Sequence, residues 1–428
     1  MKIAIVGLGY VGLPLSLQFA RSGVTVLGLD VDRAKVDAVN EGRSYIKHIP
    51  TESVAEQLKA ERFSASAEFA RVAEVEAVII CVPTPLNKNR EPDISYVLET
   101  GRAMAPHLKP GTLVALESTT YPGTTDQDLR AVLEEGSGLK AGVDFHLAFS
   151  PEREDPANPD SKVGEVPKLV GGMTPACLEK ALAVYGKAIR NLVPVSSCRV
   201  AEAAKLLENI FRSVNIALVN ELKLVYAAMG IDVWEVVEAA RTKPFGFMAF
   251  YPGPGLGGHC IPIDPFYLTW KAREFEHSTR FIELAGEINT SMPLYVIERT
   301  AEALNSLRKP INGSRILVLG LAYKPNVDDE RESPSYRIMD LLAARGASVD
   351  YHDPHVAEIR PTREHPHWAG TQSVDWSRDV IASYDAVVIA TAHEAVDYKE
   401  LAAWAPLILD TRNAMVTVAT RDGQVWKA

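Results

Sequence analysis

The sequence predicts an α/β fold with two Rossmann-like doubly wound domains joined by a long central helix and a helical region. Apolar runs of strand length alternate with helical stretches from the amino terminus, which is the pattern of a parallel sheet. A second alternating region begins at Arg315. Because a chain of 428 residues exceeds what one hydrophobic core usually supports, we expect three domains, over residues 1–198, 199–305 and 306–428.

The first domain is expected from its strands. The predicted strands are Lys2–Val6, Thr25–Leu29, Ala77–Val82, Thr112–Glu117 and Phe145–Phe149. An open α/β sheet binds its ligands in the loops at the carboxyl ends of its strands, so we expect the candidate sites in these loops.

The central region is marked by a helical period. Between Arg199 and Gly230, apolar residues recur every three or four positions, which indicates a long amphipathic helix with Gly230 as its C-cap. At roughly 1.5 Å per residue the helix spans about 45 Å, enough to connect two domains and to offer a surface to a partner subunit. We therefore expect a homodimer or a higher homo-oligomer.

The last region again alternates strands and helices. Its predicted strands are Arg315–Leu321, Ser348–Tyr351, Ala386–Ala390 and Leu407–Leu409. Ser333 and Pro334 form an N-cap and first-turn pair that begins a helix. Because this region has no GxGxxG motif, we expect it to bind a ligand other than a dinucleotide.

Composition excludes several classes of protein. Hydrophobic residues make up 47% of the chain and charged residues 23%, as in an ordinary globular protein. The net charge of −10 argues against a broad nucleic-acid-binding surface. The uncharged run from Ile3 to Ala20 contains three glycines and a proline, so it fits a strand, turn and helix better than a signal peptide or membrane span. We expect a cytoplasmic protein with neither a nucleic-acid nor a membrane partner.

The four cysteines are sparse and have no CxxC spacing. Cys81, Cys177, Cys198 and Cys260 therefore favour a reducing compartment over a disulfide framework or a zinc site, and we expect no metal.

A dinucleotide motif follows the first predicted strand. Residues 7–12 read Gly-Leu-Gly-Tyr-Val-Gly and open a helix, whose free N–H groups favour a pyrophosphate. Asp30, at the end of the second strand, can accept hydrogen bonds from ribose hydroxyls and would repel a 2′-phosphate, which favours NAD over NADP. Arg33 and Lys35 keep NADP open, since a cation could receive the phosphate. The expected cofactor contacts are Gly7, Gly9, Tyr10, Val11, Gly12, Asp30, Arg33 and Lys35.

Two further strand ends on the same edge carry hydroxyl groups. They are residues 82–85, with Thr84, and residues 117–124, with Ser118 and Thr119. Proline and glycine here can be simple turn formers. Because both loops fall where the nicotinamide half should lie, the three hydroxyls are candidates for cofactor or water contacts.

A glycine-dense loop from Tyr251 to Pro265 carries one cysteine. Asp264 and Pro265 read as the N-cap and first residue of a helix over 266–275, which places Cys260 just before a helix amino terminus. The positive potential there lowers a thiol pKa and favours a nucleophilic thiolate. Cys81 lies within a strand and is expected to be structural packing. The loop backbone can press against a ligand, with Tyr251, Gly253 and Gly257 as candidate contacts.

Two polar residues share one face of the long helix. Lys205 and Asn209 are four positions apart, and their neighbours Val200, Ala204 and Leu207 indicate that the helix is largely covered. Such a lysine is rarely buried without a partner. Glu152 and Arg153 end the strand over 145–149, either as a further site at the sheet edge or as a surface turn.

These residues together resemble the UDP-sugar 6-dehydrogenases, over essentially the whole chain. The resemblance rests on GLGYVGLP, ESTTYPGTT, SPERE, AAKLLENIFRSVNIALVNE, GPGLGGHCIPIDP and GLAYKPNVDDERESPS. It is strongest to the bacterial UDP-N-acetyl-D-glucosamine 6-dehydrogenases of surface-polysaccharide synthesis (O-antigen and capsule). It implies an NAD-binding domain, a central dimerisation and catalytic-loop domain, and a UDP-sugar-binding domain, in that order.

The resemblance also implies roles for single residues. Cys260 would be the nucleophile, Lys205 and Asn209 would hold the C6 oxygen, and Asp264 would assist proton transfer. Glu152 and Thr119 would activate and position water near the nicotinamide. Arg331 would face the cofactor. The UDP-sugar would contact Glu152, Arg153, Lys205, Asn209, Arg241 (from the same subunit or across a dimer interface), Tyr251, Gly253, Gly257, Lys324 and Arg412.

The implied reaction takes a CH2OH group to a carboxylate through two hydride transfers. A covalent thiohemiacetal avoids release of the aldehyde, and its oxidation leaves a thioester that water hydrolyses. Ile263 stands where UDP-glucose enzymes commonly carry lysine, so an N-acetylhexosamine is favoured, with UDP-GlcNAc ahead of UDP-ManNAc, UDP-GalNAc and UDP-glucose. The alternatives are a dehydrogenase that stops after one oxidation and a catalytically silent nucleotide-sugar-binding regulator.

Overall fold

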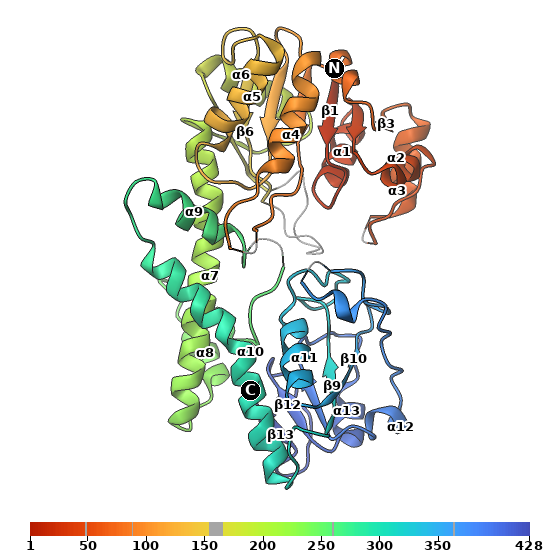
Figure 1. Ribbon diagram of the computed structural model, residues 1–428, viewed down its shortest axis with the longest axis vertical. Helices are drawn as coiled ribbons and strands as arrows, with labels where there is room; N and C mark the ends of the chain where they lie inside the picture. The colour runs from red at the N-terminus through yellow and green to blue at the C-terminus, as the bar shows by residue number, and fades with distance from the viewer. Residues whose placement is uncertain (48, 88, 154–165, 259–260, 363) are drawn as a thin grey trace. The chain divides into compact units, whose positions relative to one another are not determined.

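The computed structural model describes the chain except for residues 48, 88, 154–165, 259–260 and 363 (Figure 1). The chain forms two compact units. Unit 1 comprises Met1–Asn209 with Phe266–Ser278, and unit 2 comprises Ile210–Pro265 with Thr279–Ala428. No described helix is both long enough and apolar enough to cross a membrane.

Unit 1 contains a sheet with the strand order β3-β2-β1-β4-β5-β6-β7-β8. The five predicted strands, β1, β2, β4, β5 and β6, run parallel to one another as expected. Strands β3 and β8 are also parallel to their neighbours, whereas β7, which the sequence did not predict, pairs antiparallel with β6. The strands are β1 Lys2–Val6, β2 Thr25–Leu29, β3 Phe63–Ser66, β4 Ala77–Ile80, β5 Leu113–Leu116, β6 His146–Phe149, β7 Lys168–Gly172 and β8 Leu192–Val195.

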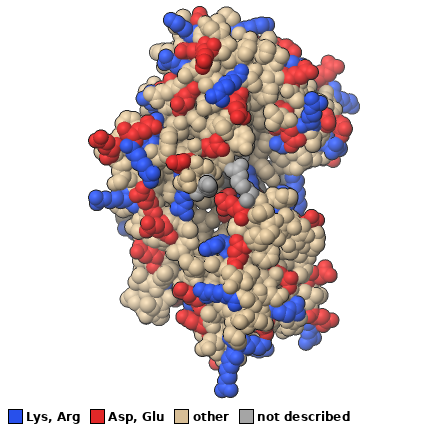
Figure 2. All heavy atoms as spheres, in the orientation of Figure 1, with Lys and Arg blue, Asp and Glu red and all other residues tan. Residues whose placement is uncertain are grey.

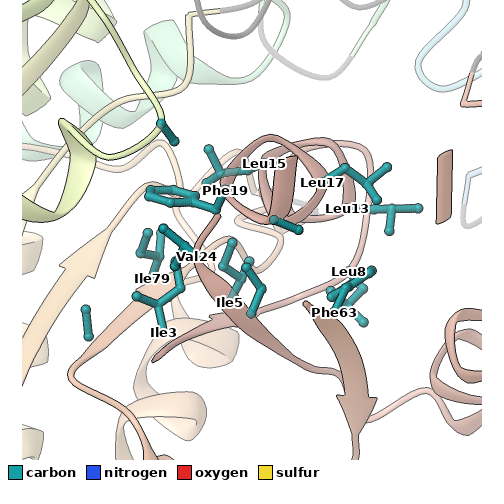
Figure 3. Close-up of a cluster of buried hydrophobic side chains, with 14 of the residues drawn as sticks. Ile3, Ile5, Leu8, Leu13, Leu15, Leu17, Phe19, Val24, Phe63 and Ile79 are labelled. Carbon is teal, nitrogen blue, oxygen red and sulfur yellow. The ribbon is translucent and has the colours of Figure 1, made fainter. Parts of the chain in front are cut away.

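Helices cover both faces of this sheet. Alternate residues of β1 point to opposite faces, so Ile3 and Ile5 join one apolar cluster while Ala4 and Val6 join the other. Figure 3 shows part of the first cluster, with Leu15 and Phe19 of α1 on the face of the sheet to which Ile3 and Ile5 of β1 point. The helices of this unit are α1 Gly12–Arg21, α2 Arg33–Asn40, α3 Thr51–Lys59, η1 Phe69–Glu74, α4 Ser95–Met104, η2 Ala105–His107, η3 Thr124–Leu129, α5 Arg130–Ser137, α6 Pro175–Tyr185 and most of α9 Asp264–Arg273.

The long central helix is confirmed as α7, Cys198–Ala228. Gly230 follows it with φ +72°, and the N–H of Ile231 donates to the carbonyl of Tyr226, as in a glycine-capped helix end. Val200 and Leu207, which were expected on a largely covered helix, are 45% and 66% exposed in the single chain. The buried face of α7 is instead strongly polar, and includes Glu202, Lys205, Asn209, Ser213, Asn220 and Lys223.

Unit 2 contains a second, entirely parallel sheet with the order β10-β9-β11-β12-β13. Its strands are β9 Arg315–Leu319, β10 Ser348–His352, β11 Ala386–Ile389, β12 Ile408–Asp410 and β13 Val425–Lys427. Its helices are α8 Val233–Arg241, α10 Arg280–Ser306, α11 Pro334–Ala344, η4 Pro366–Trp368, α12 Arg378–Ile381 and α13 Tyr398–Trp404. Ser333 caps α11 as predicted, since its hydroxyl accepts from the N–H of Ser335.

The two sheets begin with the same local construction. Gly7 follows β1 with φ +90°, and Gly320 follows β9 with φ +87°. Asp30 follows β2 and accepts from the N–H of Leu8, while Asp353 follows β10 and accepts from the N–H groups of Leu321 and Ala322. In each sheet, therefore, a carboxylate after the second strand holds the glycine turn that follows the first.

Candidate functional site

The loop between β1 and α1 has the backbone that a dinucleotide requires. A Cβ on Gly7 would lie 2.6 Å from the carbonyl oxygen of Cys81, and one on Gly12 would lie 1.8 Å from that of Gly7, so neither position tolerates a side chain. A Cβ on Gly9 would meet no atom within 4 Å, which leaves open space beside the loop for a pyrophosphate. Tyr10 and Val11 are partly buried just before α1.

Asp30, which was expected to bind the ribose, also accepts hydrogen bonds from the backbone near this loop. Its Oδ2 accepts from the N–H of Leu8 at 2.8 Å, and its Oδ1 accepts from the N–H of Asp32 at 2.9 Å. Lys35 lies 3.5 Å from the same carboxylate, so its charge is directed toward Asp30, while Arg33 is exposed at the start of α2. The hydroxyl of Tyr45 donates to the carbonyl of Leu8 at 2.5 Å, a contact that no sequence motif signalled.

The loops after β4 and β5 are tied together by their hydroxyl groups. Thr84 donates to the carbonyl of Thr119 at 2.7 Å, and Ser118 donates to that of Val82 at 2.7 Å. Tyr267 of α9 donates to the carbonyl of Thr84. The side chains of Thr84 and Ser118 therefore hold the edge of the sheet together, which leaves their hydroxyl oxygens as acceptors for a bound group.

Glu202, which sequence reasoning missed, joins α7 to the loop after β5. Its fully buried carboxylate accepts from the N–H of Gly123 at 2.8 Å and from the N–H and hydroxyl of Thr125 at 3.0 and 2.7 Å. Burial raises the pKa of Glu202 to about 7, because desolvation of the charged form outweighs these hydrogen bonds.

A second tie joins α7 to the loop after β6. The guanidinium of Arg153 lies 2.7 Å from the carboxylate of Glu208 and also donates to the carbonyl of Pro167. Lys205 and Asn209 lie on the stretch of helix that begins at Glu202 and runs just past Glu208, and both are buried, at 8% and 4% exposed. The sequence signal for this buried face was a set of polar residues spaced three, four or seven apart. They are at positions 202, 205, 209, 213, 220 and 223.

In unit 2, the glycine-dense loop contacts side chains of α7 and of the segment after β12. Gly253 donates its N–H to Asn220 of α7 at 2.9 Å, and a Cβ there would lie 2.4 Å from the guanidinium of Arg412. Arg412 donates to the carbonyl of Ala390 at 2.8 Å, and burial lowers its pKa to about 10, so it stays cationic at neutral pH. Gly253 and Arg412, both expected from sequence to contact the sugar nucleotide, therefore meet.

The same loop packs against the segment after β9. A Cβ on Gly257 would lie 2.6 Å from the Tyr323 side chain, which precedes Lys324, and the N–H of Gly258 donates to the carbonyl of Arg331. Arg331 forms an ion pair with Asp329 at 2.6 Å.

Arg241 and Tyr251 share one carboxylate. Glu238 of α8 lies 2.9 Å from the guanidinium of Arg241 and accepts from the hydroxyl of Tyr251 at 2.6 Å. Tyr251 also stacks on Trp234.

The proposed nucleophile Cys260 and its neighbour His259 lie outside the described residues. Asp264 is buried and is the first residue of α9, so the prediction that it precedes the helix as its N-cap was wrong by one or two positions.

The other three cysteines are structural. Burial raises the pKa of the Cys81 and Cys198 thiols, and the Sγ of buried Cys177 accepts from the N–H of Leu147, so these three behave as packing. Within the described part of the chain, no group of three or more His, Cys, Asp or Glu residues could hold a metal.

Charges of both signs intermingle around these elements. Figure 2 shows Lys and Arg side chains interspersed with Asp and Glu over the visible face.

Comparison with known proteins agrees with this architecture. Sequence models of the UDP-glucose/GDP-mannose dehydrogenase family match residues 1–189 (NAD binding domain), 199–291 (central domain) and 317–417 (UDP binding domain). A UDP-N-acetyl-D-glucosamine 6-dehydrogenase of Pseudomonas aeruginosa is 35% identical, over 94% of this chain and 92% of that protein. A UDP-N-acetyl-D-mannosamine dehydrogenase of Escherichia coli K12 is 36% identical, over 80% and 82%.

Solved structures give the same result. A UDP-D-ManNAc dehydrogenase from Pyrococcus horikoshii superimposes with a TM-score of 0.88 at 32% identity, over 99% of both chains. With the NAD-binding and UDP-binding domains both present, the chain belongs to the UDP-glucose/GDP-mannose dehydrogenase family and is an NAD-dependent nucleotide-sugar dehydrogenase.

Proposed function

We propose that this enzyme oxidises the C6 hydroxymethyl group of a UDP-N-acetylhexosamine, with UDP-GlcNAc as the first candidate, to the uronic acid. Relatives named for GlcNAc and for ManNAc oxidation support an N-acetylhexosamine, and Ile263 stands where UDP-glucose enzymes commonly carry lysine. We further infer that the enzyme works in the cytoplasm and supplies a uronic acid for surface polysaccharide.

One observation supports this function above the others. The segment of α7 that carries Lys205 and Asn209 is tied to the loop after β5 through Glu202 and to the loop after β6 through Glu208. Two donors, an ammonium and an amide, are therefore held beside the carboxyl edge of the sheet, where an open α/β sheet binds its ligand. Donors held in place before reaction can stabilise an oxygen as its negative charge develops.

The chemistry then assigns roles to side chains. Bound NAD supplies the hydride acceptor for both oxidations. Lys205 and Asn209 donate to the C6 oxygen while the alcohol gives up a hydride, and Asp264 assists transfer of the hydroxyl proton away from that oxygen to solvent. The thiolate of Cys260 adds to the resulting aldehyde carbon, and a second hydride loss converts this thiohemiacetal to a thioester.

Hydrolysis completes the reaction. Glu152 accepts a proton from a water molecule held by Thr119, and that water attacks the thioester carbon and expels the thiolate of Cys260. The balance is one alcohol, two NAD⁺ and one water converted to one carboxylate, two NADH and three protons.

A substrate panel tests the proposal. Incubation with NAD and UDP-GlcNAc, UDP-ManNAc, UDP-GalNAc or UDP-glucose should give the highest kcat/KM for UDP-GlcNAc and two NADH per sugar consumed. Cys260→Ala should make no uronate. One NADH per sugar, or a normal rate of uronate formation by Cys260→Ala, would refute the four-electron mechanism.

We also propose that α7 forms a homodimer interface with a second copy of the chain. Its exposed apolar side chains form a stripe along the helix, and scattered single side chains on a monomer do not form such a stripe. They are Val200, Leu207, Phe211, Leu218, Val225 and Met229. A Leu207→Glu/Leu218→Glu variant should sediment as a monomer, whereas Val143→Glu, at an exposed apolar residue far from α7 in the sequence, should keep the wild-type mass.

A further inference from the structure

A buried lysine lies behind the loops of the first sheet. Lys168, the first residue of β7, is 6% exposed, and its Nζ lies 3.0 Å from the Oε2 of Glu117. Glu117, which follows β5, is 1% exposed and accepts at its Oε1 from the hydroxyl of fully buried Tyr185, at 2.7 Å. Three polar side chains from β7, α6 and the end of β5 thus meet inside the unit.

The same ammonium reaches the end of β6. Its Nζ donates to the carbonyl of Pro151 at 3.3 Å and lies 3.8 Å from the Oε2 of Glu152. The side chain of Glu152 is 19% exposed, compared with 8% for Lys168 and 0% for Glu117, so Glu152 is the most exposed of these three side chains. Glu152 is further held by the N–H of Arg153, which donates to its Oε1 at 2.7 Å.

The ammonium stays charged in this position. Although burial disfavours the charged form, the carboxylates of Glu117 and Glu152 raise the pKa of Lys168 above its ordinary value. A buried ion pair adds little stability compared with well-packed apolar side chains, so packing alone does not account for this lysine. Its contacts with two consecutive residues, Pro151 and Glu152, give it a more specific use.

We propose that Lys168 is the positioning residue for Glu152. By binding both the carbonyl before Glu152 and the Glu152 carboxylate, its ammonium sets the direction of that carboxylate at the edge of the sheet. The carboxylate of Glu117 holds the ammonium in turn. The inference rests on the proposed function, in which Glu152 activates the water that hydrolyses the thioester. Lys168 touches neither substrate nor cofactor in this role, and it acts on hydrolysis rather than on hydride transfer.

The test removes the ammonium without leaving a buried charge. Lys168→Met alone leaves the buried carboxylate of Glu117 without its cationic partner, and this variant can fail to fold. The main variant is therefore Lys168→Met/Glu117→Gln, in which both side chains are neutral. Glu152→Gln is the reference for loss of water activation. Tyr185→Phe is the matched control, since it removes one hydrogen bond from the same buried cluster and leaves the contacts of Lys168 with Pro151 and Glu152 intact.

The readout is the covalent enzyme after one turnover with UDP-GlcNAc and NAD, weighed as intact protein. The double variant and Glu152→Gln should both accumulate the acyl-enzyme, with kcat lowered at least tenfold and the KM for NAD within about twofold of wild type. Tyr185→Phe should accumulate none. A double variant that turns over without acyl-enzyme, or that loses NAD affinity and hydride transfer instead, overturns the role of Lys168.

The two proposals fail in different ways. If Glu152→Gln forms no covalent adduct and the wild-type enzyme makes only one NADH per sugar, the proposed four-electron function is wrong. If Glu152→Gln accumulates acyl-enzyme and the double variant does not, the function stands and only the inference on Lys168 is wrong.

Discussion

The carboxylate of Glu202 accepts both the backbone N–H and the hydroxyl of Thr125, at 3.0 and 2.7 Å. The two residues are 77 positions apart in sequence. Their contact links the helix that carries Lys205 to the loop that carries Thr119. This buried carboxylate therefore helps to set the spacing between these two candidate site residues.

Glu202 should give stability a recognisable pH dependence. Because its pKa is raised to about 7 in the folded chain from 4.5, the group favours folding most at low pH, and that contribution is lost as pH rises through about 7. Glu202→Gln cannot titrate. The melting temperature of wild type minus that of Glu202→Gln should therefore fall between pH 5 and pH 8. A difference that stays constant or grows over this range would contradict the assignment.

Lys205 should matter for turnover more than for binding. Lys205→Met removes a donor to the C6 oxygen, and loss of one such donor typically lowers kcat about 100- to 1,000-fold. Arg212→Met removes an exposed cation from the same helix and should keep kcat within about twofold. Steady-state kinetics with UDP-GlcNAc and NAD measure both. Equal losses in the two variants would show that Lys205 acts only through the general charge of α7.

Asp30 should control the choice of cofactor. Asp30→Asn weakens its bonds to ribose hydroxyls, and since hydrogen bonds to charged groups are worth about 1.5–3 kcal/mol, the Kd for NAD should rise about tenfold or more. The preference for NAD over NADP should narrow as the negative charge is lost. Asp32→Asn retains the cap of α2 and should leave both values unchanged. Isothermal titration with each cofactor gives the comparison.

Gly253 should act on the sugar nucleotide through Arg412. The Cβ of Gly253→Ala would lie 2.4 Å from the guanidinium, which must then move. We expect the KM for the UDP-sugar to rise about tenfold, equivalent to about 1.4 kcal/mol, with NAD binding unchanged. If the clash is the cause, Gly253→Ala/Arg412→Ala should bind no worse than Arg412→Ala alone. Additive losses would instead indicate a change in the loop itself.

Local patterns predicted the fold well. The glycine loop, Asp30, the cap at Ser333 and the length of α7 all depend on residues close together in sequence. The strands β3, β7, β8 and β13 were missed. Strand β3 reads Phe-Ser-Ala-Ser, β8 contains proline and β7 has two glycines, all of which weaken a strand signal, and β13 has only three residues.

Local sequence patterns did not predict the contacts between residues that are far apart in the sequence. Periodicity located two faces on α7, but an apolar stripe and a polar stripe have the same period, so the sequence did not show that the chain buries the polar face and leaves Val200 and Leu207 exposed. Glu117 and Lys168 are 51 positions apart, and no motif connects them. Helical spacing located Lys205 and Asn209 on one face and a strand end located Glu152, whereas their roles in the reaction came from family resemblance and remain predictions.

The paired glycine turns of the two sheets show how one template can serve two nucleotides. In the first copy the position two residues after the turn glycine is Gly9, beside open space, whereas the second copy has Ala322 there. The carboxylate of Asp353 accepts four backbone N–H groups and lies 3.0 Å from the imidazole of His393, whereas the carboxylate of Asp30 accepts two backbone N–H groups. The methyl group of Ala322 and the additional contacts of Asp353 therefore distinguish the second turn from the dinucleotide-binding one, in a region that matches a UDP-binding family model.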